Sequence, residues 1–339
     1  MRRRFTYGLL LTIMACSQAL AQSNLEIKNY LILGVETAEE LASLYLEPLS
    51  EGLLYGLTGA WNHSAQVKKP WELDIALVAN GSFVPSEKLF KEIDISAIDN
   101  LEVLGGANRV RIPTILGSET SEVTFVGTYN DEEFIFDAPT GIGLFSTNLL
   151  PNVFVQASMG LPYDTEIGFR FFPKLKIDDA TLGIFGFGLK HELGQSIKAM
   201  SNWPVSIAVF GAFTRLDAEY EFKTDGFVTG EGQRIDAFLN SWLVEGLAST
   251  KFPKLNVYGG FGYVRGKSNY VLKGTYTIET ETETLDFVDP FDVQGDISGL
   301  KGSLGASLRL SRFRINLDYT FQGFNNLAFG LHYNLVKPK

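Results

Sequence analysis

The stretch Ser311–Gly323 reads SRFRINLDYTFQG and carries a strict two-residue alternation. Apolar side chains occupy every odd position from Phe313 to Phe321, and polar side chains occupy the even positions between them. An apolar residue at every second position is typical of a β-strand with one apolar face. In a soluble sheet that face meets a protein core, whereas in a membrane barrel it meets lipid and the polar face lines the interior.

The two stretches that flank this one repeat the pattern. Residues 300–310 and 327–335 alternate in the same way, and their polar faces are rich in Gly, Ser, Ala and Asn. Alternating spans of about ten residues, separated by turns, are the sequence signature of an outer-membrane barrel. We therefore expect Leu317 and Phe329 to face lipid and the small polar residues to face a lumen.

The amino-terminal residues have the features of a secretory signal peptide. Residues 2–4 are all arginine, residues 7–15 are mostly apolar, and Ala19-Leu20-Ala21 offers an A-x-A cleavage site. The apolar part is too short to span a membrane as a helix. Cys16, the only cysteine, leaves lipid attachment as an alternative. Cleavage after Ala21 would leave a chain without cysteine and therefore without disulfides.

The composition excludes some classes of function. There are 39 acidic residues against 29 basic ones, and this acidity argues against binding to nucleic acid. No run reaches the roughly 18 apolar residues that a membrane-spanning helix needs, so an integral membrane protein would have to be a barrel. An aromatic content of 13% and 34 glycines suit a barrel with aromatic girdles and a narrow interior.

The alternation predicts an all-β fold, an antiparallel transmembrane β-barrel of about twelve strands over residues 51–339, with ten or fourteen strands as alternatives. Besides the three spans above, the predicted spans are 53–61, 71–83, 109–116, 152–161, 166–172, 182–191, 205–215, 235–248 and 255–264. The long polar segments 217–234 and 269–296 are expected outside the cell, and residues 119–145 are expected to form an acidic loop. Within the second polar segment, TYTIETETET (Thr275–Thr284) predicts an external hairpin.

Residues 22–50 are expected to form a short helix before the first strand. Thr37-Ala-Glu-Glu40 matches a capping box, and Pro48 is expected to end the helix. The helix could pack elsewhere on the protein or plug the periplasmic mouth of the barrel, with residues 85–106 as further plug material. As a plug it would contact the inner wall through Leu41, Leu44 and Tyr45.

No motif in the sequence identifies a reaction. The glycine-rich stretches 183–188 and 259–266 do not fit a phosphate-binding loop and are better explained as narrow lumen faces. The three histidines lack a G-x-S-x-G partner motif, and the acidic residues 286–296 do not fit a calcium loop. We therefore expect no catalytic residue, no cofactor and no metal site.

Seven charged residues are expected to line the lumen. Their signs are mixed, which argues against a strongly selective ion pore, and a ladder of salt bridges that stiffens the wall is an equal alternative to contact with substrate. They are Glu166, Arg170, Lys190, Arg309, Arg312, Arg314 and Asp318.

Several short motifs resemble an uncharacterised family of Gram-negative outer-membrane β-barrels whose mature part opens with a short helix. The matching residues are Tyr45–Leu49, Gly56, Gly59, Trp61, Pro113–Gly117, Gly160–Pro162, Arg170–Pro173, Gly186–His191 and Pro204–Val205. The layout is more distantly similar to the long-chain fatty-acid transporter barrels. The Asn-Pro-Ala motif of those transporters is absent, and so is the terminal aromatic residue usual in outer-membrane barrels.

The alternation and this resemblance together imply a location in the cell outer membrane, with outer-membrane lipid and a small hydrophobic ligand as partners. The acidic composition leaves nucleic acid out of the expected partners. The expected function is passive transport of a small molecule through a partly plugged lumen. A non-transporting barrel with a structural or partner-binding role is the alternative, and an outer-membrane enzyme is the third.

Overall fold

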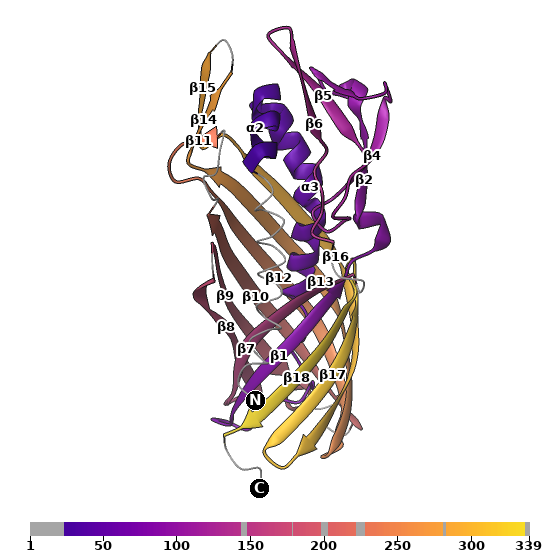
Figure 1. Cartoon of the computed structure of the whole chain (residues 1–339). Coiled ribbons are helices and arrows are strands. Elements are labelled where there is room, and N and C mark those ends of the chain that lie inside the picture. Colours follow the sequence, from indigo (N-terminus) through magenta and orange to yellow (C-terminus); the bar gives the residue numbers. More distant parts are fainter. Residues whose placement is uncertain are drawn as a thin grey trace.

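The computed structural model describes residues 24–143, 148–177, 179–197, 203–221, 228–280 and 283–335, so the predicted signal peptide and Cys16 lie outside the described residues. Within these residues ten antiparallel strands form a closed barrel in the order β1-β18-β17-β16-β13-β12-β10-β9-β8-β7, and β7 pairs with β1 (Figure 1). Their bounds are β1 Leu73–Phe83, β7 Leu149–Leu161, β8 Thr165–Ile177, β9 Ala180–Glu192, β10 Val205–Glu221, β12 Arg234–Thr250, β13 Leu255–Lys273, β16 Asp292–Leu310, β17 Phe313–Phe321 and β18 Asn326–Asn334.

The predicted count of twelve is wrong, because two of the predicted spans lie outside the barrel wall. Residues 53–61 belong to the end of a helix and to the chain that follows it. Residues 109–116 contain β4 (Arg109–Pro113), which pairs with β2 (Phe90–Asp94) in a separate two-stranded sheet. The barrel therefore begins at Leu73 rather than at residue 51.

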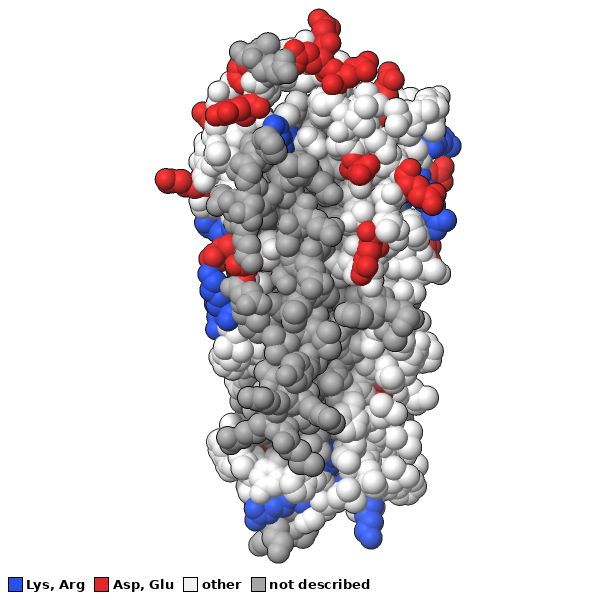
Figure 2. Space-filling model, in the orientation of Figure 1, with Lys and Arg blue, Asp and Glu red and all other residues white. Residues whose placement is uncertain are grey.

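The predicted orientation of the carboxyl-terminal strands is confirmed. Leu317 is 53% exposed and Phe329 is 46% exposed on the outside, whereas Asn316 and Ala328 are buried inside. On the face in Figure 2, acidic side chains gather towards the top of the view, and the described surface of the lower half is almost uncharged down to a few basic side chains at the bottom. An apolar outer surface of this extent requires lipid. The protein is a β-barrel of the outer membrane.

The two ends of the barrel differ in their connections. At one end, which we call the turn end, Pro162–Asp164 joins β7 to β8, Ser311–Arg312 joins β16 to β17, and β18 finishes. The opposite end, the loop end, holds the insertion 84–148 between β1 and β7. Short turns face the periplasm and long loops face the exterior in barrels of this kind, so the loop end is external.

The loop end carries three small sheets and two turns of 3₁₀-helix. The predicted external hairpin is confirmed as β14 and β15, and the predicted acidic loop contains the hairpin β5–β6. The sheets are β2–β4, β3–β5–β6 and β11–β14–β15. The remaining bounds at this end are η1 Ser86–Lys88, η2 Ile95–Ala97, β3 Leu101–Val103, β5 Thr124–Tyr129, β6 Glu132–Asp137, β11 Val228–Thr229, β14 Thr275–Glu279 and β15 Thr284–Val288. The short helix α4 (Leu193–Ser196) follows β9 at the turn end.

Two helices precede the barrel, and they begin at the loop end rather than at the expected periplasmic side (Figure 1). They are α2 (Asn24–Leu33) and α3 (Val35–Gly56). Gly34 separates them with a φ of 121°, a conformation that favours glycine, and it is the N-cap of α3 in place of the predicted Thr37. Pro48 lies inside α3 and does not end it. No helix among the described residues is both long enough and apolar enough to cross a membrane.

The first half of α3 packs largely against the insertion, although Ala42 and Tyr45 also pack against the cluster that fills the barrel. Leu41 and Leu44 contact a cluster built from Ile93, Ile112, Phe125 and other insertion residues. Residues 85–106 contribute to this external cluster, so they are not material inside the barrel. The Tyr45 hydroxyl donates to the Thr140 carbonyl at 2.6 Å. The second half of α3, from Leu46 to Gly56, packs inside the barrel.

Ion pairs fasten α3 to the insertion. Lys88 lies 2.7 Å from a Glu51 oxygen, and Lys91 lies 2.6 Å from a Glu47 oxygen. Burial raises the pKa of Glu47, but the hydrogen bond and charge of Lys91, together with the charge of Lys88, outweigh burial and hold that pKa below the ordinary value. Burial lowers the pKa of Lys88, but the hydrogen bond and charge of Glu51 raise it above the ordinary value.

This arrangement predicts that acid loosens the contact between α3 and the insertion. A carboxylate with a lowered pKa in the folded state contributes stability above its unfolded pKa, and that stability is lost as pH falls through the folded pKa. These pairs are partly exposed, so the loss is at most about 1 kcal/mol. Amide protection of η1 and β2, corrected for intrinsic exchange rates, should fall between pH 7 and pH 3.

Glu47→Gln should flatten this pH dependence, whereas Glu40→Gln, on an exposed position of the same helix, should leave it intact. Equal protection at both pH values in the unaltered protein would contradict the role of the ion pairs.

The lipid-facing register predicts a depth-dependent cost for charge. Leu317→Arg, in the middle of β17, should cost about 2–4 kcal/mol of unfolding free energy, while Leu310→Arg, beside the turn, should cost about 0–1 kcal/mol. Urea titration of the protein folded into lipid vesicles measures both. Equal costs would mean that Leu317 does not face the hydrocarbon layer.

Candidate functional site

The chain between α3 and β1, residues 57–72, passes through the inside of the barrel and is called the lumen segment below. Side chains from six positions on the wall donate hydrogen bonds to its backbone carbonyls, between residues 57 and 64. The donors are Gln156, Arg170, Lys190, Thr214, Lys301 and Ser307, at 2.6–3.3 Å. The wall therefore recognises the backbone of this segment, which has no helix or strand of its own.

The contact between the wall and the lumen segment that lies farther from the turn end is centred on Arg170 of β8. Its guanidinium donates to the carbonyls of Leu57 at 3.1 Å and Gly59 at 2.6 Å, and its Nε donates to Gln156 at 2.9 Å. The same group lies 4.0 Å from the ring centre of Trp61 and 4.1 Å from that of Phe154. Carbonyl oxygens and aromatic faces thus stabilise a fully buried positive charge.

Glycines on the neighbouring strands make room for Trp61. A Cβ at Gly186 or Gly188 would meet the Trp61 ring at 3.2 Å, and a Cβ at Gly168 would meet it at 3.4 Å. The glycine repeat in β9, expected as a narrow lumen face, therefore accommodates this indole.

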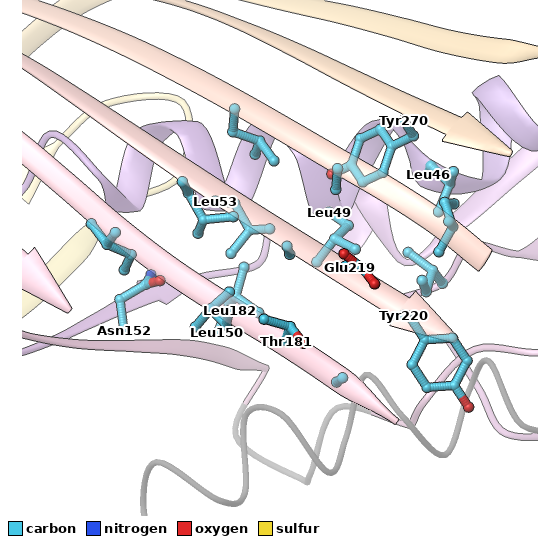
Figure 3. Close-up of a pocket in the computed structure, with 18 of the residues that line it drawn as sticks. Leu46, Leu49, Leu53, Leu150, Asn152, Thr181, Leu182, Glu219, Tyr220 and Tyr270 are labelled. Carbon is cyan, nitrogen blue, oxygen red and sulfur yellow. The ribbon is translucent and has the colours of Figure 1, made fainter. Parts of the chain in front are cut away.

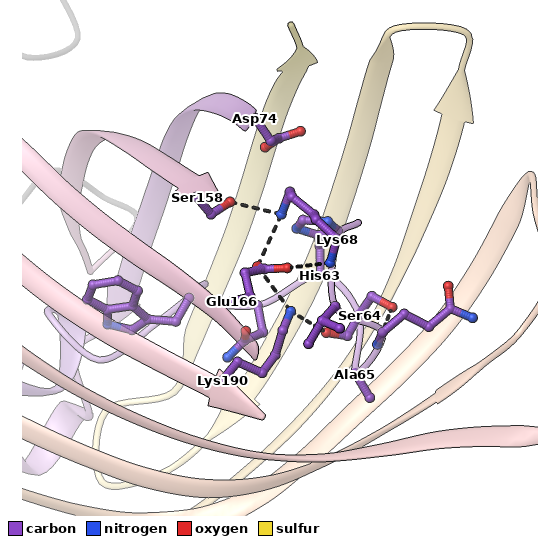
Figure 4. Close-up of polar contacts among 12 residues, drawn as sticks. His63, Ser64, Ala65, Lys68, Asp74, Ser158, Glu166 and Lys190 are labelled. Carbon is purple, nitrogen blue, oxygen red and sulfur yellow. Dashed lines mark hydrogen bonds and ion pairs between the residues drawn. The ribbon is translucent and has the colours of Figure 1, made fainter. Parts of the chain in front are cut away.

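A second contact lies nearer the turn end and is centred on Glu166 (Figure 4). Its Oε1 is 3.1 Å from Nζ of Lys68 and 3.1 Å from Nζ of Lys190, and its Oε2 accepts from the Lys68 backbone at 3.0 Å. Lys68 also donates to Ser158 at 2.9 Å, and Lys190 donates to the Ser64 carbonyl. One carboxylate thus joins two ammonium groups that come from the lumen segment and from the wall.

The histidines inside the barrel are also hydrogen-bonded. His332 contacts Asp74 through Nδ1 and Asn316 through Nε2, each at 2.8 Å. His63, in the lumen segment, contacts Arg314 and packs against the His332 ring, with ring centres 4.5 Å apart. The third histidine, His191, is on the outward-facing side of β9 and lies 3.3 Å from the Thr165 hydroxyl. Among the described residues, no group of three or more His, Cys, Asp or Glu is arranged to hold a metal ion.

The structure places five of the seven predicted lumen residues inside the barrel. Glu166, Arg170, Lys190 and Asp318 are buried, and Arg314 is half-buried. Arg309 and Arg312 lie at the turn end instead, where Arg312 donates to the hydroxyl of Tyr333 on the outer side of β18.

Sequence reasoning missed the partners of these residues. Lys301 pairs with Glu245 at 3.1 Å, and Lys68 and Asp74 lie in the networks above. Alternation did place Lys301 on the polar face of residues 300–310, and it could also have identified Glu245 and Asp74 as inward-facing.

An apolar cavity of about 140 Å³ lies in the external half of the barrel, between α3 and the wall (Figure 3). Leu46, Leu49 and Leu53 of α3 form one side, and residues of β7, β9, β10, β12 and β13 form the other. An engineered apolar cavity of about 150 Å³ in another protein stays dry and binds benzene. The size and lining of this cavity therefore suit a small apolar molecule.

Next to this cavity the ladder of backbone hydrogen bonds between β7 and β8 is interrupted. The unpaired part of these two strands is called the seam below. The pairing of β7 with β8 runs from Leu161↔Thr165 to Val155↔Phe171 and goes no further. Beyond it, residues 149–154 of β7 pair with β1, and β8 continues along β9 after a register shift between Phe172 and Leu175.

Prolines account for the interruption. Pro151 and Pro173 lie on the two sides of the seam, and neither has an N–H group for a ladder hydrogen bond. Residues 173–176 are exposed at four successive positions, so this part of β8 has no buried face.

The cavity reaches the seam. Pro151 and Val153 belong to the outward-facing positions of β7, yet both line the cavity. Val153 also pairs with Ala79, and Ala79 pairs with the lipid-facing Phe329. Val153 therefore lies at the level of the apolar belt, the part of the outer surface that faces lipid. Part of the cavity lining thus comes from the outward-facing side of β7, next to the seam and at the level of the apolar belt.

Comparison with solved structures finds outer-membrane proteins. Ail, the attachment invasion locus protein of Yersinia pestis, aligns with 78% of this chain and 98% of its own at 10% identity and a TM-score of 0.26. The translocator domain of the autotransporter NalP from Neisseria meningitidis aligns over 89% and 99% at 10% identity and 0.29. The P. putida toluene transporter TodX aligns over 80% and 92% at 8% identity and 0.18. Such low identities and TM-scores give no information on ligand or activity.

No curated protein matches the chain by sequence. A family model does match, and it covers residues 1–335. The chain belongs to this family, which is described as a family of unknown function (DUF6588).

Proposed function

We propose that this barrel carries a small apolar molecule between the cavity beside α3 and the surrounding outer-membrane lipid, through the seam between β7 and β8. The observation that supports this proposal is the lining of the cavity by Pro151 and Val153, which otherwise belong to the lipid-facing side of β7. An apolar solute on this route would leave lipid without crossing water, so it would keep its favourable transfer free energy throughout.

The contents of the lumen favour this lateral route over a path along the barrel axis. Between the cavity and the turn end the lumen segment is hydrogen-bonded to the wall, and the ion pairs of Glu166 and Lys301 are buried there. In this proposal α3 and the lumen segment act together as the plug that the sequence predicted. Breaking several buried hydrogen bonds at once would cost several kcal/mol, since each leaves groups unsatisfied at about 1–3 kcal/mol.

A partner-binding role is the second candidate. The insertion 84–148 and the β11–β14–β15 sheet form a folded external part with its own apolar clusters, which is more than short connections require. We also propose that the protein is not an enzyme, because His63, His191 and His332 contact Arg314, Thr165, Asp74 and Asn316, and none of these contacts activates a serine or cysteine.

Closing the seam should slow exchange of solute with lipid. If the β7–β8 ladder continued, Val153 would lie opposite Pro173, so the pair Val153→Cys and Pro173→Cys, with Cys16→Ser, can join the two edges by a disulfide. ¹⁹F exchange NMR of fluorobenzene in lipid nanodiscs measures its transfer between the cavity and lipid. We expect the oxidised pair to slow this exchange at least about ten-fold, which corresponds to ~1.4 kcal/mol in the barrier, and reduction to restore it.

A second pair of cysteine substitutions, nearer the turn end of the same two strands, serves as the control. Ala157 and Phe169 are already paired and face outward, so the disulfide Ala157→Cys/Phe169→Cys should leave exchange unchanged. Unaltered exchange in the oxidised seam pair, with the cavity still occupied, would overturn the lateral route.

A further inference from the structure

A row of basic side chains lies at the turn end of the barrel. Lys254 and Arg309 lie one step beyond Leu255↔Leu308, a register pair of β13 and β16, and the Arg309 N–H donates to the Lys254 carbonyl at 2.8 Å. Arg309 is also the register partner of Arg314 on β17. Partners in an antiparallel pair point to the same face, where like charges destabilise the sheet. Three cations, called the basic row below, thus lie side by side across β13, β16 and β17.

The exposed members of the basic row have no acidic partner. No acidic residue occurs in 246–278 or 297–317, the stretches of sequence around the row. Arg314 is half-buried, whereas Lys254 and Arg309 are exposed. Within the described part of the chain, neither of these two exposed cations makes an ion pair or a side-chain hydrogen bond. Both are therefore open to an anion from outside the chain.

Apolar side chains border the basic row on the side that faces lipid. Two register pairs on the outer face of the same strands end the apolar belt here, and each of their side chains is 42–52% exposed: Leu255↔Leu308 and Leu310↔Phe313. The row therefore lies where the belt meets the headgroup layer of the periplasmic leaflet. Arg312 shows that a side chain of this turn can reach the outer side, since it donates to the outward-facing hydroxyl of Tyr333.

We propose that Lys254 and Arg309 bind the phosphate of an anionic phospholipid, such as phosphatidylglycerol, in the periplasmic leaflet. The phosphate accepts hydrogen bonds from the ammonium and the guanidinium, and the acyl chains lie along the apolar side chains that border the row. A guanidinium can bind two phosphate oxygens at once, and a basic cluster beside a membrane attracts anionic lipid. This site lies at the opposite end of the barrel from the cavity, so it is independent of the proposed solute route.

Two lipids with the same acyl chains test the preference. Dioleoyl phosphatidylglycerol is anionic and dioleoyl phosphatidylcholine is zwitterionic, and native mass spectrometry of the detergent-solubilised protein measures the dissociation constant of the first bound molecule of each. We expect phosphatidylglycerol to bind about ten-fold more tightly, as two cations beside a membrane surface provide. The double variant Lys254→Gln/Arg309→Gln should lower this ratio about five-fold or more, through loss of phosphatidylglycerol affinity.

Two further variants separate the effect of charge from that of structure. Lys254→Arg/Arg309→Lys keeps both charges and should keep the preference. Arg109→Gln/Arg111→Gln removes the same charge from exposed positions of β4, outside the barrel wall, and should leave the preference unchanged. Heat-modifiable migration on gels checks that each variant is a folded barrel.

The outcomes also distinguish a lipid from a free phosphate. Glycerol 3-phosphate carries the phosphate without acyl chains, so at the concentration that saturates the site with phosphatidylglycerol it should displace none of the lipid. Displacement at that concentration would mean that the row binds a free anion, and it would overturn the lipid. Equal affinities of the unaltered protein for the two lipids, or a preference that survives Lys254→Gln/Arg309→Gln, would overturn the site itself.

Discussion

The fold depends on one constraint: the carbonyl groups of the lumen segment must be hydrogen-bonded inside a barrel whose lower interior is filled with protein. A chain without helix or strand cannot satisfy these groups by itself, so the wall must supply donors. Arg170, Lys190 and Lys301 do so, and each is almost fully buried. These cations are explained by the backbone they bind rather than by a pore that they would line.

The same constraint separates the interior into two regions. Near the turn end, paired charges and hydrogen bonds fix the lumen segment to the strands. Near the loop end, α3 satisfies its own backbone, so the wall opposite it can be apolar, and the cavity lies there. The seam occurs beside this apolar region, where Pro151 and Pro173 remove ladder donors. The interruption leaves the pairing of β7 with β8 intact in the half of the barrel nearer the turn end.

The sequence was sufficient for strands whose two faces differ strongly. Leu317 and Phe329 were predicted correctly because alternation alone separates lipid from interior. Alternation could not distinguish residues 53–61 from a strand, although they form the end of α3 and the start of the lumen segment. Nor could it show that Arg109–Pro113 pairs with β2 instead of a barrel strand, because pairing is a tertiary property. Arg309 and Arg312 fell outside the lumen because they lie beside a turn, where the strand no longer encloses an interior.

The functional features were harder to predict for the same physical reason. The lumen segment has no periodicity, so its place inside the barrel follows only from the donors that surround it. The prolines at the seam are a sequence signal, yet they acquire meaning only once β7 and β8 are known to be neighbours.

Single-channel recording of the unaltered protein in planar bilayers tests the filled lumen most directly. If the wall donors hold the lumen segment in place, no water-filled path runs along the barrel axis, and the account predicts no steady ion conductance in concentrated salt. A steady, ohmic conductance of the kind that an open porin gives would contradict it.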